Sequence, residues 1–324
     1  RIAELEGAHR TYLVPGGLAA ITATYLVTCK AGSHALLPAS AYPPNRELGE
    51  GVLARFGIEV EHYDPLIGGA IASLIRDNTA LIWCESPGSI TMEIQDVPAI
   101  AAAAKARGVP VALDNTYAAG VLFDAFAARV DISIQALTKY VGGHSDVFMG
   151  SVAVRDRALV QAMDDGVLHI GWAVSPDDAY QMLRGLRTLA TRMARHDQSA
   201  RRIAAWLAER PEVAQMRHPA LPGCPGHDIW RRDYSGACGL FAFTLKPAPA
   251  TATAAFLNAL KVFGLGFSWG GFESLAIDCG PQLRCREDGG AGDGALIRLH
   301  IGLEDPDDLI ADLTAALDAW RSLA

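Results

Sequence analysis

The sequence predicts an α/β protein with two domains, a large one built on a mostly parallel sheet and a smaller α+β domain after it. The first half alternates short apolar runs with helical stretches, which implies a parallel sheet with helices on both faces. Near residue 175 the alternation of strand-like and helix-like segments ends, and a long helical region begins. Because 324 residues suffice for two domains, we place them at residues 1–185 and 186–324.

The strands of the large domain are indicated by apolar runs with turn-forming residues at their ends. Six runs have this form, at residues 35–38, 58–63, 80–84, 109–113, 131–135 and 151–154. Helical segments separate them, and the clearest is the alanine-rich stretch at 97–107. In sheets of this kind, ligands bind beyond the carboxyl ends of the strands.

The smaller domain is expected to begin with helices. Ser175 is a good capping residue, and the proline and acids that follow it suit a first helical turn. The helical pattern runs to about residue 210 with an interruption at Gly185. Later we expect strands at 239–245 and 295–301, a glycine-rich loop at 286–294, and a last helix after Asp305.

Composition excludes several classes of function. The net charge of −8, without a basic cluster, argues against nucleic acid as a partner. The sequence contains no apolar stretch of membrane-spanning length. The six cysteines show no C-x-x-C spacing, which favours reduced thiols and a cytoplasmic location. The nine histidines lack metal-ligand spacing, so we expect no metal.

The most informative feature is the pairing of Lys139 with Asp114, because each follows or ends a predicted strand. Taken singly, Lys139 suits a surface position and Asp114 suits a helix cap. Together they suit pyridoxal 5′-phosphate (PLP), which needs an amine for a Schiff base and an anion beside its ring nitrogen. Partial burial would lower the pKa of Lys139 toward the neutral form that attacks an aldehyde.

Further residues fit the same cofactor or its substrate. The turn at Gly16, Gly17 and Leu18 opens a helix whose backbone N–H groups suit a phosphate, although it also suits an ordinary tight turn. Tyr42 suits stacking on a ring or packing in its loop. Arg298 interrupts an apolar strand, where a cation must meet a carboxylate of the protein or of a ligand.

The chain resembles the Cys/Met-metabolism group of fold-type I PLP enzymes, whose large domain is like that of aspartate aminotransferase. The resemblance runs from about Leu5 to the end. It rests on six motifs in order: Pro-Gly-Gly-Leu-Ala-Ala-Ile, Glu-Ser-Pro-Gly-Ser-Ile-Thr-Met-Glu, Asp-Asn-Thr-Tyr-Ala-Ala-Gly-Val-Leu-Phe, Thr-Lys-Tyr-Val-Gly-Gly-His-Ser-Asp, Arg-Gly-Leu-Arg-Thr-Leu and Ser-Trp-Gly-Gly-Phe-Glu-Ser.

The resemblance implies roles for the residues that match these motifs. Lys139 would bond to the cofactor and carry protons, and Tyr42 would join it in catalysis by stacking on the ring. Asp114 would face the ring nitrogen. The cofactor phosphate would be bound by Gly17, Leu18 and Thr138. The substrate carboxylate would be bound by Arg298, Ser268 and Trp269.

The resemblance also implies the reaction. Trp269 stands where γ-acting relatives carry leucine, so we expect β-elimination from L-cystathionine, which yields homocysteine, pyruvate and ammonia. The alternatives are a γ-acting enzyme, a broad cysteine desulfhydrase, or a weakly catalytic PLP-binding protein whose main role is association. A homotetramer made of two dimers is the expected assembly.

Three differences from the family pattern stand out. Ala136 replaces a serine that supplies a phosphate hydroxyl in γ-acting relatives, and Phe267 replaces a tyrosine. In the family, an upstream Tyr-x-Arg motif grips the cofactor phosphate of the neighbouring subunit. No such motif precedes Leu5, so we expect this sequence to lack that N-terminal arm.

Overall fold

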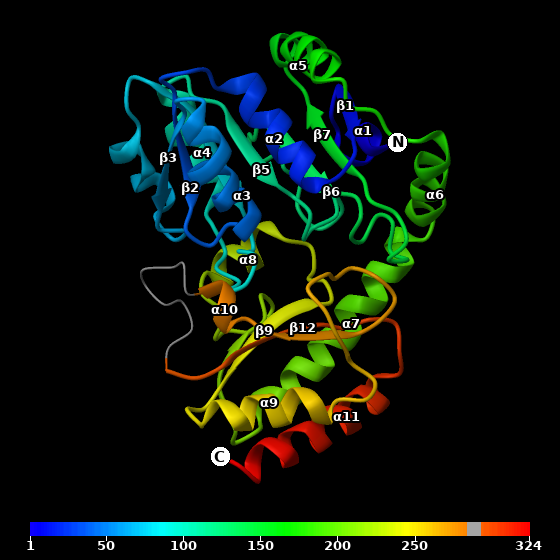
Figure 1. The fold of residues 1–324 in the computed structure, drawn as a ribbon. Helices are drawn as coiled ribbons and strands as arrows, with labels where there is room; N and C mark the ends of the chain where they lie inside the picture. Colours follow the sequence, from blue (N-terminus) through cyan, green and yellow to red (C-terminus); the bar gives the residue numbers. More distant parts are fainter. Residues whose placement is uncertain (284–292) are drawn as a thin grey trace.

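The computed structural model describes residues 1–283 and 293–324 and contains two sheets, each with its own helices (Figure 1). Cys285 and most of the loop expected at 286–294 lie outside the described residues. The first sheet ends at Val154 and the second begins at Val213, so the predicted boundary at residue 185 falls between them. The exact boundary stays a prediction.

The first sheet has seven strands in the order β1-β7-β6-β5-β4-β2-β3. The five strands β3, β2, β4, β5 and β6 run parallel to one another, whereas β7 is antiparallel to β6 and to β1. The prediction of a mostly parallel sheet is therefore confirmed. The strand bounds are β1 Arg10–Val14, β2 His34–Pro38, β3 Glu59–Tyr63, β4 Thr79–Glu85, β5 Val111–Asp114, β6 Ile132–Ala136 and β7 Gly150–Val154.

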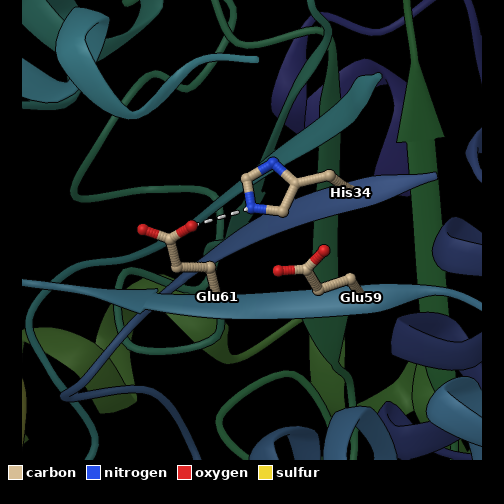
Figure 2. A group of neighbouring side chains, drawn as sticks. All are labelled: His34, Glu59 and Glu61. Carbon is tan, nitrogen blue, oxygen red and sulfur yellow. Dashed lines mark ion pairs between the residues drawn. The ribbon is translucent and has the colours of Figure 1, made fainter. Parts of the chain in front are cut away.

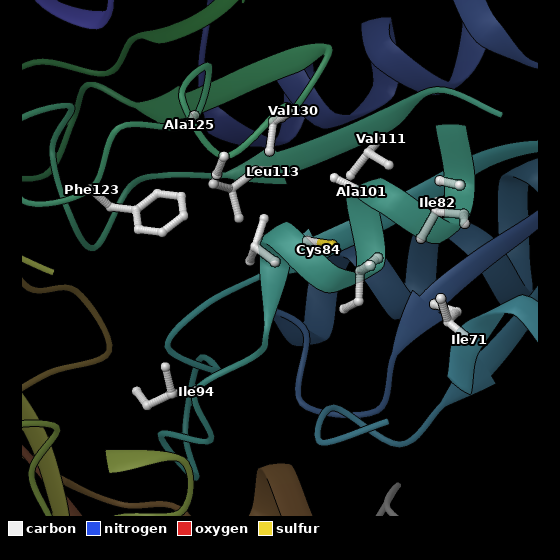
Figure 3. Close-up of a cluster of buried hydrophobic side chains, with 14 of the residues drawn as sticks. Ile71, Ile82, Cys84, Ile94, Ala101, Val111, Leu113, Phe123, Ala125 and Val130 are labelled. Carbon is white, nitrogen blue, oxygen red and sulfur yellow. The ribbon is translucent and has the colours of Figure 1, made fainter. Parts of the chain in front are cut away.

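Helices cover both faces of this sheet, as the continuous apolar runs predict. On one face Ile82, Cys84 and Leu113 pack against helix α4 (Figure 3). On the other face Trp83 stacks on Tyr25 of α2, with 5.4 Å between ring centroids. Alternate residues of β4 therefore point to opposite faces of the sheet and belong to two separate apolar cores. The helical segments of this part are α1 Ile2–Glu6, α2 Gly17–Thr28, α3 Pro43–Leu48, η1 Gly49–Leu53, η2 Gly68–Leu74, α4 Val97–Ala106 and α5 Arg157–Ile170.

The second sheet has five strands in the order β10-β11-β12-β9-β8. Its apolar core contains Phe241, Phe243 and Phe256, together with Leu309, Leu313, Leu317 and Trp320 of the last helix. The strand bounds are β8 Val213–Arg217, β9 Leu240–Leu245, β10 Gly264–Leu265, β11 Leu275–Asp278 and β12 Leu296–His300. The helices are α6 Pro176–Leu186, α7 Leu189–Ala208, α8 His227–Asp233, α9 Ala250–Ala259, α10 Gly280–Leu283 and α11 Pro306–Arg321.

The helical region is interrupted between α6 and α7, after Leu186, and the glycine at residue 185 has a tertiary cause. A Cβ atom there would lie 2.3 Å from the carbonyl oxygen of Gly142, so only glycine allows the end of α6 to approach this loop. Arg192 of α7 then donates a hydrogen bond of 2.6 Å to the Tyr140 carbonyl. These contacts tie the long helical region to the segment that follows Lys139.

None of the helices in the described ranges is long and apolar enough to cross a membrane.

Candidate active site

The carboxyl ends of the central strands converge on one cavity. Glu85 ends β4 and is paired in register with Asp114, which ends β5, and Lys139 comes three residues after the end of β6. The cavity has a volume of about 240 Å³. Its lining includes these three residues together with Gly17, Leu18, Tyr42, Thr138 and Trp269. The structure therefore brings together the residues that the sequence predicts for cofactor binding.

A second cavity of about 540 Å³ adjoins the first one. The two cavities share Tyr42, Thr138, Lys139 and Trp269 among their lining residues. Ser268 and Arg298 line the second cavity only. Lys139 therefore stands between the predicted cofactor site and the predicted substrate site.

The Lys139 amine is held by contacts from the second half of the chain. Its Nζ donates a hydrogen bond of 2.9 Å to Ser268 Oγ and lies 5.3 Å from the centre of the Trp269 ring. Burial lowers the pKa of Lys139 to about 8, and the positive charge of Arg298 acts in the same direction. The charge of Asp114 opposes both effects. The lysine is thus partly neutral near physiological pH.

We expect the apo-protein to bond PLP faster as the pH rises. With a pKa of about 8, about a tenth of the Lys139 amines are neutral at pH 7 and about nine tenths at pH 9. Because only the neutral amine attacks an aldehyde, the rate should rise about tenfold over this range. Stopped-flow absorbance measures it, and Lys139→Ala is the control. A rate independent of pH would contradict the lowered pKa.

Asp114 is oriented by its own loop. Its Oδ1 accepts a hydrogen bond of 3.0 Å from the backbone N–H of Thr116 and another from the Thr116 hydroxyl. That hydroxyl oxygen in turn accepts a bond of 2.8 Å from the N–H of Ala136 on β6. Burial raises the pKa of Asp114 to about 6. Sequence reasoning missed Thr116, although an aspartate followed two residues later by threonine is a common turn pattern.

The predicted phosphate site lies at the start of α2. The N-cap Gly16 has no side chain to bond the first N–H groups, so the donors of this turn are available to a ligand. A Cβ atom on Gly17 would lie 2.6 Å from the Cβ atom of Ala136, so glycine is required there. Thr138 lies nearby, but its hydroxyl bonds the backbone N–H and C=O of Met149. Its bond to the phosphate stays a prediction.

Arg298 has the surroundings expected of a carboxylate-binding residue. It lies in β12 with 8% of its surface exposed, and its Nη2 donates to the carbonyl of Phe267. Burial lowers the pKa of Arg298. Within residues 1–283 and 293–324, no carboxylate forms an ion pair with it. A buried cation beside a cavity favours an anionic ligand there.

The turn that carries Ser268 and Trp269 is fitted closely to the lysine. Gly270 has a φ of +84°, and a Cβ atom on it would lie 2.9 Å from the carbonyl carbon of Lys139. His300 Nε2 accepts a hydrogen bond of 3.1 Å from the Gly270 N–H. The turn therefore requires glycine both for its conformation and for its close approach.

The comparison with known families agrees with this geometry. Residues 1–318 match the family described as "Cys/Met metabolism PLP-dependent enzyme". The chain belongs to this family. The match covers both sheets and every predicted site residue, so the resemblance read from the six sequence motifs is confirmed.

Individual members of the Cys/Met metabolism family resemble the chain over most of its length. It is 50% identical to a putative cystathionine beta-lyase of Rhizobium johnstonii, covering 95% of this chain and 78% of that protein. It is 44% identical to the cystathionine beta-lyase MetC of Escherichia coli, covering 96% and 80%. A cystathionine gamma synthase structure from Xanthomonas oryzae superposes with a TM-score of 0.94 at 31% identity, covering 100% and 84%.

The residues at the first cavity fit the cofactor of the Cys/Met metabolism family. The N–H groups at the start of α2, which no side chain caps, suit a phosphate, and the glycine at residue 17 lets this turn lie against Ala136 at the end of β6. Asp114 suits a protonated ring nitrogen, and Lys139 suits an aldehyde. These residues line one cavity and match three parts of PLP, which are the phosphate, the ring nitrogen and the aldehyde.

One other polar cluster lies far from this site along the strands. His34, Glu59 and Glu61 come close to one another near the beginnings of β2 and β3 (Figure 2). Arg76 forms ion pairs with both glutamates, and His34 Nδ1 is 2.9 Å from Thr79 Oγ1. These bonds account for the cluster without a metal, and the prediction that the chain uses no metal stays a prediction.

Proposed function

We propose that the chain is a PLP-dependent carbon–sulfur β-lyase that cleaves L-cystathionine to homocysteine, pyruvate and ammonia. The observation that carries this proposal is the position of Lys139 between two joined cavities, one containing Asp114 and the other containing Arg298. Relatives named cystathionine beta-lyase, at 50% and 44% identity, support the choice of substrate.

The side chains divide the work of this reaction. Arg298 holds the α-carboxylate of the substrate in the second cavity, helped by Ser268 and Trp269. Lys139 removes the proton from Cα and then donates a proton to the departing thiolate. Bound PLP supplies an electron sink for the negative charge that develops at Cα. Asp114 keeps a proton on the ring nitrogen, which the electron sink requires.

The preference for β-elimination is supported by Trp269. Its ring lines both cavities and lies beside the Lys139 amine, which places it where the substrate side chain must pass. The γ-acting relatives generally carry leucine at this position. Cleavage at the γ-carbon requires a second proton to be removed from the β-carbon, and a bulky ring beside the Lys139 amine restricts the movement that this second step needs. The restriction favours cleavage at the β-carbon.

Product analysis tests the proposal. The purified chain with PLP should convert L-cystathionine to pyruvate and homocysteine, measured by coupled dehydrogenase assay and thiol chromatography. Formation of 2-oxobutyrate and cysteine would instead indicate a γ-lyase. Pyruvate from cysteine but not from cystathionine would indicate a desulfhydrase. PLP binding without turnover of either substrate would favour the association protein.

The assembly and location that we propose follow from the same family. A homotetramer of two dimers is supported by Phe148 and Phe267, which are 79% and 72% exposed at the second cavity, where a neighbouring subunit would cover them. A cytoplasmic location is supported by the five cysteines of the described residues, which are free thiols and buried. Light scattering of the holoenzyme measures the assembly.

A further inference from the structure

Glu85 lies in the cofactor cavity without a role in the mechanism above. It ends β4 directly beside Asp114, and its side chain lines the same cavity. Only 8% of its surface is exposed. A second buried carboxyl group beside the one that faces the cofactor costs free energy, so its presence calls for an explanation.

The carboxyl group of Glu85 bonds the backbone of the residue that is expected to stack on the cofactor. Its Oε2 accepts a hydrogen bond of 2.8 Å from the N–H of Tyr42. The Glu85 backbone is itself fixed, because its N–H donates a bond of 2.8 Å to Gln95 Oε1. Gln95 Nε2 donates in turn to the buried hydroxyl of Tyr63, at 3.0 Å. Glu85 is therefore a rigid acceptor.

Tyr42 has few other restraints. It is the N-cap of α3, and its side chain makes no cap hydrogen bond. Within the described residues its phenol oxygen has no hydrogen-bond partner, and 42% of the residue is exposed. The two residues that follow, Pro43 and Pro44, restrict the backbone but supply no N–H donors. The Tyr42 carbonyl accepts a bond of 2.8 Å from the N–H of Asn45 within α3, and the bond from the Tyr42 N–H to Glu85 joins this residue to the end of β4.

The protonation of Glu85 agrees with such a role. Burial is the main cause that raises the pKa of Glu85 well above its usual value, and the neighbouring Asp114 raises it further. The raised pKa favours the neutral form of Glu85 while Asp114 carries the charge that faces the cofactor. A neutral carboxyl group still accepts a hydrogen bond through its carbonyl oxygen, and so does the amide of glutamine.

We propose that Glu85 is a positioning residue that sets the place of the Tyr42 ring over the cofactor through the backbone hydrogen bond of Tyr42. The proposal rests on the proposed function, because the stacking role of Tyr42 belongs to it. It predicts that a neutral acceptor suffices at residue 85, and that the effect of Glu85 depends on the Tyr42 ring.

The test is a double-mutant cycle in the PLP-loaded protein. Glu85→Gln keeps the acceptor, and Glu85→Met keeps the volume but removes it. Each is made alone and together with Tyr42→Ala. Measurements are kcat and KM for pyruvate release, the circular dichroism of bound PLP, and thermal denaturation. If Glu85→Met does not fold, Glu85→Ala takes its place.

We expect Glu85→Met to lower kcat/KM about 10- to 30-fold, because a buried hydrogen bond is lost. Glu85→Gln should recover activity to within about threefold of the wild type. In the Tyr42→Ala background, Glu85→Met should change kcat/KM less than about twofold, since the ring to be positioned is gone. The dichroism of bound PLP should change with Glu85→Met and not with Glu85→Gln.

Two results would overturn the proposal. One is an equal effect of Glu85→Met with and without the Tyr42 ring, and the other is no recovery with Glu85→Gln. The dichroism does not require turnover, so it tests the positioning even if L-cystathionine is not a substrate. Failure of pyruvate release by the wild type would then count against the proposed function alone.

Discussion

Lys139→Ala is expected to lower kcat for pyruvate release from L-cystathionine by at least about 10³-fold, since one amine both bonds the cofactor and carries the protons. Its Nζ stands between the two cavities and contacts Ser268 and Trp269. No other lysine lines either cavity among the described residues. A coupled pyruvate assay with excess PLP measures the loss.

The matched control for this change is Lys105→Ala. Lys105 lies exposed near the end of α4, away from both cavities, so its replacement tests the loss of a lysine without the loss of the site. The control should keep the wild-type rate. Pyruvate formation by Lys139→Ala at a rate near that of the wild type would show that the lysine has been assigned wrongly.

Asp114→Asn is expected to lower kcat about 10²- to 10³-fold while leaving the fold intact. An anion about 4 Å from a pyridinium contributes roughly 4 kcal/mol at an effective dielectric of 20, which corresponds to about three pKa units. Without that charge the ring nitrogen loses its proton near neutral pH, and the electron sink weakens. Asparagine has nearly the same shape and can still accept the bonds from Thr116.

The loss should have a spectroscopic signature. A pH titration of the absorbance of bound PLP should show the ring nitrogen losing its proton at lower pH in Asp114→Asn than in the wild type. Asp165→Asn, at an exposed position of α5, is the control and should change neither the titration nor kcat. Activity of Asp114→Asn within about threefold of the wild type would contradict the role of this carboxylate.

In the first sheet, the local apolar pattern of the sequence predicts every strand except β1. The predicted strands agree with β2 to β7 within a few residues. Apart from β3, which lies at an edge of the sheet and alternates polar and apolar residues, they are mostly apolar runs buried between two helical layers. The strand β1 was not predicted. Its residues Arg10–Val14 mix polar and apolar side chains, as expected of a strand at the edge of the sheet.

In the second sheet, β8, β10 and β11 were also missed, and each has a local reason. β10 has only two residues, both exposed, and β11 has four residues that are mostly half-buried. β8 follows a long helix and carries polar residues at alternate positions. Their strand conformation depends on pairing with distant residues, which the local apolar pattern does not reveal.

The sequence by itself determined the fold class, the family and the positions of Lys139, Asp114 and Arg298, because strand ends and motifs are local features. Only the tertiary structure decided that Arg298 of the second sheet faces the same lysine, that Thr116 orients Asp114, and that Glu85 holds Tyr42. The physical reason is that these contacts join residues on different strands and loops. These residues come within contact distance only when both apolar cores have packed and the chain segments between the residues have closed into loops.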